Sequence, residues 1–138
     1  MKKNYTTQSE QDTIDLGRRL GATLQPGATV LLSGDLGAGK TVFVCGLAKG
    51  LGLDDSAVNS PTFTLIQEYR GALTLFHVDL YRLARAESDD LGLEELASER
   101  SIVAIEWAEK LTRPWPGPNP VCVSIEDRGD DVRAIRIE

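Results

Sequence analysis

The sequence predicts a single α/β domain of three layers, with helices packed on a sheet that mixes parallel and antiparallel strands. The length of 138 residues suits one domain, covering 1–138. A short apolar run at 28–32, a glycine-rich loop and a segment with helical spacing predict a strand, a loop and a helix in that order. Alternating runs at 62–79 and 121–137 add antiparallel pairs, and a continuous apolar run at 102–105 indicates a buried parallel strand.

The first elements are a helix, a strand and a second helix. Ser9 is a candidate N-cap, and leucines every four residues from 16 to 24 then lie on one helix face. Gln25-Pro26-Gly27 ends that helix. Residues 28–32 suit a strand, and residues 42–51 suit the helix that follows the glycine-rich loop.

A hairpin and a short helix are expected next. Residues 62–69 and 73–79 suit two antiparallel strands around a tight turn at 70–72. Residues 88–96 carry an acidic amphipathic pattern that is typical of a short helix.

The last third of the chain predicts three strands. Residues 102–105 form the strand buried on both faces. Prolines within 114–120 make an extended connector, and 121–125 with 132–137 then form a final antiparallel pair.

Residues 34–41 read Gly-Asp-Leu-Gly-Ala-Gly-Lys-Thr, a complete G-x-x-x-x-G-K-[ST] phosphate-binding loop. Glycines let successive backbone N–H groups approach phosphate oxygens, and the helix that follows directs its positive end there. Lys40 would reach the β- and γ-phosphates, and Thr41 would offer its hydroxyl to Mg²⁺. The pattern predicts a P-loop NTPase-like domain; a glycine-rich turn that ends in Lys-Thr by chance is the alternative. The predicted nucleotide contacts in the loop are Asp35, Leu36, Gly37, Ala38, Gly39, Lys40 and Thr41.

Hydrolysis also needs an acidic residue near Mg²⁺ and a group that orients the attacking water. Glu106 follows the run at 102–105, the better candidate for a strand beside the loop's own strand, and is predicted to contact Mg²⁺ directly or through water. Asp79 ends the preceding alternating run and would lie across the site, where it could orient or deprotonate water. Either residue could instead be an ordinary solvent-facing carboxylate. His77 shares the strand face of Asp79, although a lone histidine there is more often structural.

Two further residues are candidates for the nucleotide site. Thr62 lies in Ser-Pro-Thr-Phe-Thr at 60–64, where hydroxyls beside a proline suit a segment that senses the γ-phosphate. A simple strand entry is the alternative reading of that segment. Trp107 follows Glu106 and could pack over the site or fill the edge of the core.

Composition narrows the possible partners and the location. The net charge is −6, with basic residues scattered along the chain, which argues against direct gripping of a nucleic-acid backbone. Any RNA would therefore be reached through a partner. No run approaches membrane-spanning length, so a cytosolic protein without membrane contact is expected. Cys45 and Cys122 have no second cysteine at metal spacing, and two buried free thiols are expected.

Missing motifs narrow the class of enzyme. The guanine-specific Asn-Lys-x-Asp segment is absent, and Asp79 does not begin a D-x-x-G because Leu80-Tyr81-Arg82 follow it, so a preference for GTP is unsupported. A transporter-type ATPase would need a longer chain and a Ser-Gly-Gly signature, which this sequence lacks. A small-molecule kinase stays open, with Arg82, Arg85 and Arg100 as lid candidates, although little chain is left for a lid and an acceptor pocket. A nucleotide switch with negligible turnover is a third class.

Five segments together resemble one family. In this order and spacing they strongly resemble the TsaE (YjeE) family over nearly the whole chain. The phosphate loop is generic, whereas the H-x-D-L-Y-R-L segment followed by the E-W pair is specific to that family. The segments are Gly34-Asp35-Leu36-Gly37-Ala38-Gly39-Lys40-Thr41, Ser60-Pro61-Thr62-Phe63-Thr64-Leu65, His77-Val78-Asp79-Leu80-Tyr81-Arg82-Leu83, Leu91-Gly92-Leu93-Glu94-Glu95 and Ile105-Glu106-Trp107.

The resemblance implies an ATPase needed to make threonylcarbamoyladenosine next to the anticodon of tRNAs that read codons beginning with A. It implies that ATP and Mg²⁺ are the cofactors and that the protein binds a TsaB–TsaD complex. Hydrolysis of ATP would reset that complex between turnovers, and tRNA would be met only through the complex.

The resemblance also assigns roles to residues. Lys40 and Thr41 would hold phosphate and Mg²⁺, with Glu106 as a further Mg²⁺ contact. Asp79 would act in hydrolysis. The remaining carried-over positions are Thr62 in the switch segment, Trp107 by the nucleotide, and an adenine site near residues 8–13 and Arg133.

Overall fold

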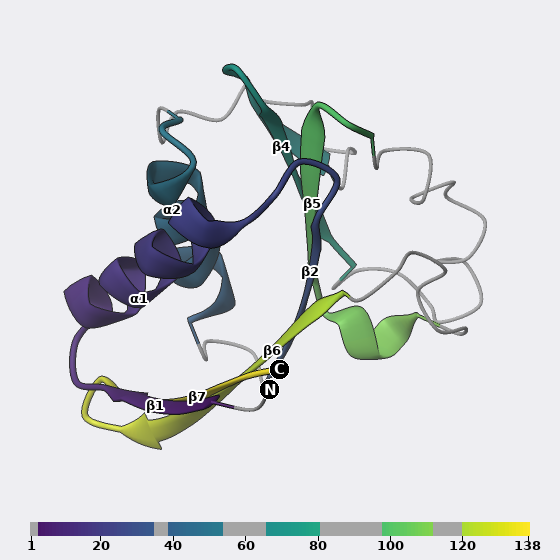
Figure 1. Ribbon diagram of the computed structural model, residues 1–138. Helices are drawn as coiled ribbons and strands as arrows, with labels where there is room; N and C mark the ends of the chain where they lie inside the picture. The colour runs from purple at the N-terminus through teal and green to yellow at the C-terminus, as the bar shows by residue number, and fades with distance from the viewer. Residues whose placement is uncertain (1–2, 35–38, 54–65, 81–97, 112–119) are drawn as a thin grey trace.

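The structure, a computed structural model, describes residues 3–34, 39–53, 66–80, 98–111 and 120–138 (Figure 1). Every predicted strand and both longer predicted helices fall at least partly within these ranges. Several predictions concern residues outside these ranges: the loop positions Asp35, Leu36, Gly37 and Ala38, the switch residue Thr62, the lid candidates Arg82 and Arg85, the expected helix at 88–96 and most of the proline connector.

One sheet of seven strands runs through the described residues, in the order β1-β7-β6-β2-β5-β4-β3. The strands are β1 (Lys3–Thr7), β2 (Thr29–Gly34), β3 (Ile66–Tyr69), β4 (Thr74–Asp79), β5 (Ser101–Glu106), β6 (Val121–Gly129) and β7 (Val132–Ile137). The central strands β6, β2, β5 and β4 are parallel, whereas β1 and β7 at one edge and β3 at the other pair antiparallel. The predicted mixed sheet, with both predicted antiparallel pairs, is confirmed.

The edge strand β1 is not predicted by the sequence. Its side chains are polar apart from Tyr5, and only Thr7 is buried, so the alternating signal is short. Its pairing with β7, with Lys3 opposite Ile137 and Thr7 opposite Arg133, places it in the sheet. Backbone pairing, and not an apolar face, therefore accounts for this strand.

Two helices, α1 (Glu10–Thr23) and α2 (Lys40–Gly50), lie side by side on one face of the sheet (Figure 1). Glycines bring their backbones together, because a Cβ on Gly46 would lie 3.0 Å from the Cα of Gly17. Within the described residues, neither helix is long and apolar enough to cross a membrane.

The core lies on both faces of the central strands. The helix-covered face buries one cluster, which includes Leu16 from α1, Phe43, Val44 and Leu47 from α2, and Val30, Leu32, Ile102 and Ala104 from the sheet. The opposite face buries a second cluster of Val78, Leu80, Val103 and Ile105. All six residues of β5 are buried, as predicted for a strand covered on both faces.

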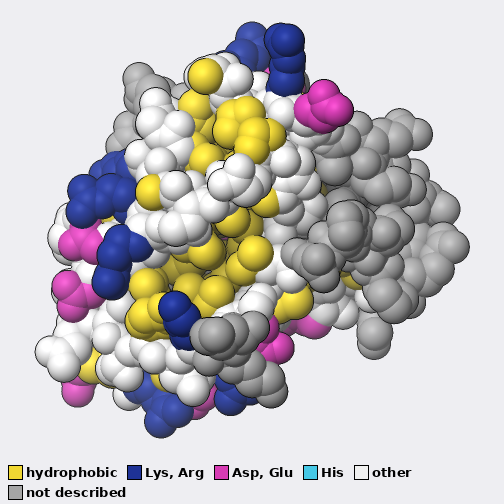
Figure 2. Space-filling view, viewed as in Figure 1, with side chains coloured by type: hydrophobic (Ala, Val, Ile, Leu, Met, Phe, Trp, Pro, Cys, Tyr) yellow, Lys and Arg dark blue, Asp and Glu magenta, His cyan; other side chains and the backbone are white. Residues whose placement is uncertain are grey.

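Part of the helix-side core reaches the surface. Figure 2 shows hydrophobic side chains gathered in a band between the helices and the sheet. A groove lies between α1 and the antiparallel edge, at the start of β6, with a volume of about 380 Å³. Its apolar lining residues are Tyr5, Leu16, Leu20, Val121 and Ile137.

The two cysteines differ in exposure. Neither forms a disulfide; Cys45 is half-buried and Cys122 is exposed. The expectation of two buried thiols is wrong for Cys122, because its side chain lies on the outward face of β6, where alternate residues are exposed.

Candidate nucleotide site

Three parallel strands end where the predicted site residues gather. Leu32 of β2 is the register partner of Glu106 on β5, which is in turn the partner of Asp79 on β4. Because the carboxyl ends of parallel strands meet at one edge of a sheet, both acidic residues lie at the edge where β2 leads into the loop and α2. The predicted central position of β5, beside the strand of the loop, is confirmed.

Helix α2 begins in a way that suits an anionic ligand. Gly39, its N-cap, has a φ of 105°, in the left-handed region that favours glycine. Among the described residues no side chain caps this helix start. The N–H groups of its first turn lie at the positive end of the helix dipole and are therefore available to bind an anion.

The ammonium of Lys40 lies at this helix start and is buried, with the residue only 4% exposed. Its Nζ donates a hydrogen bond to the carbonyl oxygen of Gly34, the first residue of the loop. Nζ also lies 3.6 Å from the centre of the Trp107 ring. A carbonyl oxygen and an aromatic face both favour a cation, so the charge is held at the mouth of the loop.

Thr41 and Glu106 are in direct contact. The Thr41 hydroxyl lies 2.9 Å from Oε2 and 3.2 Å from Oε1 of Glu106, and Glu106 is 3% exposed. These are hard oxygen donors, the kind that Mg²⁺ prefers. Mg²⁺ usually takes one or two protein ligands and completes its shell with water and phosphate, so a pair of residues is sufficient. Among the described residues, no group of three or more histidine, cysteine or acidic side chains is arranged so that it could hold a metal ion.

The backbone turns sharply after β5. Trp107 has a φ of 61°, which is uncommon for a residue with a side chain. This conformation follows Glu106 directly and precedes the short 3₁₀ helix η3 (Ala108–Lys110). The indole thereby reaches Lys40 and also packs against the second core cluster, so Trp107 lies both beside the loop and at the edge of the core.

Asp79 and His77 lie beside Glu106 on the neighbouring strand. Asp79 is half-buried at the end of β4, next to Glu106 and not across the site from it. His77 is 4% exposed, and its Nε2 contacts Oε2 of Glu106. Sequence reasoning left this histidine open; the signal for it was its place two residues before Asp79 on the same strand face.

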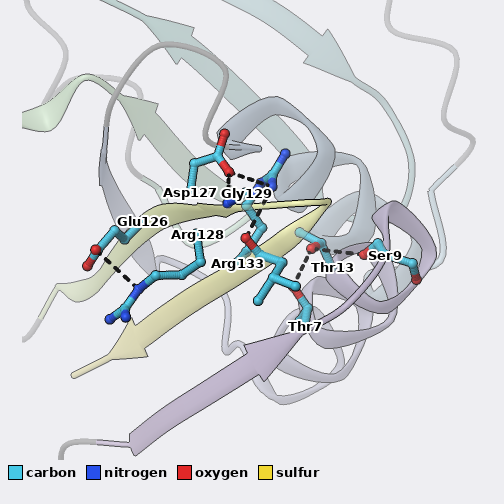
Figure 3. Close-up of polar contacts among 9 residues, drawn as sticks. Thr7, Ser9, Thr13, Glu126, Asp127, Arg128, Gly129 and Arg133 are labelled. Atoms are coloured by element: carbon cyan, nitrogen blue, oxygen red, sulfur yellow. Dashed lines mark hydrogen bonds and ion pairs between the residues drawn. The ribbon is translucent and has the colours of Figure 1, made fainter.

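Arg133, on β7, reaches the loop from the antiparallel edge. Its Nη1 forms an ion pair with Oδ1 of Asp127 at 3.0 Å (Figure 3). A Cβ built on Gly39 would lie 3.5 Å from the Nε of Arg133. The side chain, 18% exposed, therefore lies beside the start of α2.

A polar cleft of about 690 Å³ opens beside the loop on the antiparallel half of the sheet. Ser33 and Gly34 line it together with Glu109, whose Oε2 lies 3.5 Å from the Gly34 nitrogen. No motif singles out Glu109, because its approach depends on the turn that η3 makes after β5.

The described part of the site thus unites residues from four regions of the chain. Lys40, Thr41, Glu106 and Trp107 are in contact, with Asp79 and His77 alongside and Arg133 next to Gly39. The family model of TsaE, described as threonylcarbamoyl adenosine biosynthesis protein TsaE, matches residues 7–135. The chain belongs to the TsaE family.

Individual TsaE proteins match over most of their length. The chain is 42% identical to tRNA threonylcarbamoyladenosine biosynthesis protein TsaE of Treponema pallidum, over 95% of this chain and 96% of that protein. It is 41% identical to the protein of the same name from Bacillus subtilis, over 95% and 82% of the two chains. The crystal structure of Bacillus subtilis YdiB superposes with a TM-score of 0.75 at 33% identity, covering 99% of this chain and 84% of that one. Membership of the TsaE family connects the chain with biosynthesis of threonylcarbamoyladenosine in tRNA.

Proposed function

We propose that the chain is a Mg²⁺-dependent ATPase that supports a TsaB–TsaD complex in forming threonylcarbamoyladenosine next to the anticodon of tRNAs that read codons beginning with A. The observation that carries the hydrolytic part is the contact of the Thr41 hydroxyl with the buried Glu106 carboxylate at the start of α2. Family membership carries the part that concerns tRNA modification.

Phosphate recognition falls to the loop and to Lys40. The Nζ of Lys40 would exchange the Gly34 carbonyl for the β- and γ-phosphate oxygens of ATP, which offer a stronger, charge-assisted hydrogen bond. The uncapped first turn of α2 would donate to the same phosphates. The loop motif assigns the backbone of Asp35, Leu36, Gly37 and Ala38 to this role as well.

Thr41 and Glu106 would hold the metal ion. When bound by these two side chains, Mg²⁺ would offset the negative charge that develops on the phosphates during hydrolysis. Both side chains are already within hydrogen-bonding distance of each other, so little rearrangement is needed to bring two oxygen ligands to one point.

Asp79 is the residue that we propose to orient or deprotonate the attacking water. It ends the strand next to Glu106, so its carboxylate starts from the same edge of the sheet. From there it would accept a proton from water or fix its orientation. Thr62 would sense the γ-phosphate from the switch segment.

Trp107 and Arg133 would flank the nucleotide. The indole lies on Lys40, and Arg133 lies beside Gly39, so both border the position of the phosphates. We place the adenine between Arg133 and residues 8–13, which precede and begin α1. An Arg side chain can stack on a base as well as pair with phosphate.

The proposed partners explain how an acidic chain serves tRNA. A net charge of −6 gives no general attraction to a nucleic-acid backbone, so the TsaB–TsaD complex would carry the tRNA. Since that reaction modifies tRNA, we expect the chain to act in the cytoplasm.

Phosphate release tests the proposal. We expect slow release from ATP by the purified chain alone and faster release when TsaB, TsaD and tRNA are added together. Labelled phosphate on a small acceptor would instead identify a kinase, and release that stays negligible in every mixture would identify a switch.

A matched pair of variants tests the metal role. Thr41→Ser keeps the hydroxyl, whereas Thr41→Val has nearly the same shape without it. We expect Thr41→Ser to retain Mg²⁺-dependent turnover and Thr41→Val to lose it. Equal turnover in the two variants would remove Thr41 from the metal site. In cells, loss of the protein should remove the modified nucleoside from tRNA digests.

A further inference from the structure

We propose that His77 is a positioning residue that holds the Glu106 carboxylate in place for the metal ion. This inference rests on the proposed function, because it assumes that Glu106 serves Mg²⁺. It adds a residue from a different strand, whose side chain acts on Glu106 and not on the nucleotide.

The sheet register directs the imidazole toward Glu106. His77 lies opposite Ala104, and Asp79 lies opposite Glu106, so the histidine is two residues behind the carboxylate on the same face. The small side chain of Ala104 leaves the imidazole room to extend along β5. Nε2 thereby reaches Oε2 of Glu106.

The chemistry of the pair fixes which group donates. A carboxylate that binds a metal ion is ionised and only accepts hydrogen bonds, so in the metal-binding form of the pair the hydrogen lies on Nε2 of His77. The Thr41 hydroxyl also lies 2.9 Å from this Oε2, so two donors from two elements hold one oxygen. The carboxylate is thereby fixed in orientation before any ligand binds.

The other ring nitrogen shows that packing alone does not explain this histidine. Nδ1 is buried and has no hydrogen-bond partner in the described structure. A buried polar atom without a partner costs free energy, and an apolar residue would avoid that cost. Among the described residues, the contact with Glu106 is therefore the interaction that favours a histidine over an apolar residue at position 77.

Two substitutions of equal length separate donation from packing. His77→Gln keeps an N–H donor at about the reach of Nε2, and His77→Met fills similar space without a donor. Calorimetric titrations measure the affinity for an ATP analogue at increasing Mg²⁺ concentrations. The quantity compared between variants is the Mg²⁺ concentration at which half of the gain in affinity is reached. Because changes in partners of metal ligands weaken metal binding by about 10- to 100-fold, we expect that shift for His77→Met and less than about threefold for His77→Gln.

A second background tests whether His77 acts through Glu106. In a Glu106→Ala chain, which lacks the carboxylate that His77 holds, adding His77→Met should change the Mg²⁺ requirement by less than about twofold. Thermal unfolding of each variant shows that it is folded. Should His77→Met not fold, His77→Asn, whose amide is too short to reach Oε2, takes its place.

The outcomes distinguish this inference from the function on which it rests. If wild-type affinity for the analogue does not depend on Mg²⁺, the metal role of Glu106 fails and the inference falls with it. If the wild type depends on Mg²⁺ but His77→Met needs no more of it than His77→Gln, only the role of His77 is wrong. An undiminished effect of His77→Met in the Glu106→Ala chain would likewise overturn it.

Discussion

The two helices begin in opposite ways, although they lie side by side on the same face of the sheet (Figure 1). Helix α1 satisfies its own start: Ser9 Oγ accepts a hydrogen bond from the Asp12 nitrogen at 3.0 Å, and Asp12 Oδ2 accepts one from the Gln8 nitrogen at 3.1 Å. Its first turn carries two acidic residues. Helix α2 has no acidic residue in its first turn, and its N-cap is a glycine.

The start of α2 is electrostatically unfavourable by itself. Lys40 places a positive charge at the end of the helix where the peptide dipoles are already positive. Glycine at the N-cap supplies no side-chain oxygen, whereas Ser9 does. The start of α2 breaks both rules, whereas the neighbouring helix α1 obeys them, and this contrast indicates a site that an anion completes. Substitutions at the start of α2 should therefore change ligand binding, whereas removal of the N-cap side chain of α1 should change the stability of the fold.

The largest expected effect is on binding at α2. Removing a buried charge that pairs with an anion costs about 2–5 kcal/mol, so Lys40→Ala should weaken ATP binding by roughly 30-fold to more than 1,000-fold. Calorimetric titration with an ATP analogue measures this change. Because the lysine charge is unfavourable at its helix end, we expect the free energy of unfolding to stay within about 1 kcal/mol of wild type. Unchanged affinity would contradict the assignment of the loop.

Glu106→Ala should separate binding from chemistry. We expect much of the ATP affinity to remain, while turnover falls by about 100- to 1,000-fold, as for other groups that stabilise developing charge. Glu68→Ala, on the edge strand β3, is the control, since Glu68 forms an exposed ion pair with Arg70. Unchanged turnover in Glu106→Ala would transfer the metal role to Asp79.

The fold was predictable where local patterns decide it. Apolar runs at 28–32 and 102–105 became β2 and β5, and the spacing after Ser9 became α1, because burial of these faces is strong and periodic. β1 was not predictable, since its place depends on backbone pairing with β7 and not on its own side chains. The order of the strands likewise arises from contacts between distant segments.

Some residues of the site could be predicted from local motifs, and others could not. The loop motif fixes Lys40 and Thr41 locally, and Glu106 followed from the expectation that β5 lies beside β2. The contact of His77 with Glu106 depends on the register of β4 against β5, which no short pattern contains. Arg133 was proposed only through the family resemblance, because its place beside Gly39 depends on the sheet order β7-β6-β2.

Two arginines of the terminal hairpin test whether the antiparallel edge of the sheet contributes to binding at the start of α2. Arg133 lies beside the start of α2, whereas Arg128 pairs with Glu126 on exposed surface (Figure 3). Arg133→Ala should lower nucleotide affinity by about 10- to 100-fold, the scale of one charge-assisted hydrogen bond. Arg128→Ala should change it by less than about twofold, since exposed ion pairs contribute little. Equal losses in titrations of the two variants would mean a general effect of charge and no contact by Arg133.

The smallest effect should come from the start of α1 and should be one of stability alone. Removing an N-cap side chain costs about 1 kcal/mol, so Ser9→Ala should lower the midpoint of thermal unfolding by roughly 2–5 °C. Ser9→Asp, which still offers a capping oxygen, should retain most of the wild-type midpoint. ATP affinity should be unchanged in both variants, because the hydroxyl of Ser9 is engaged with its own helix. A loss of affinity in Ser9→Ala alone would show that the Ser9 hydroxyl itself, and not only other groups of residues 8–13, contacts the nucleotide, and the contrast between the starts of α1 and α2 would then be one of degree.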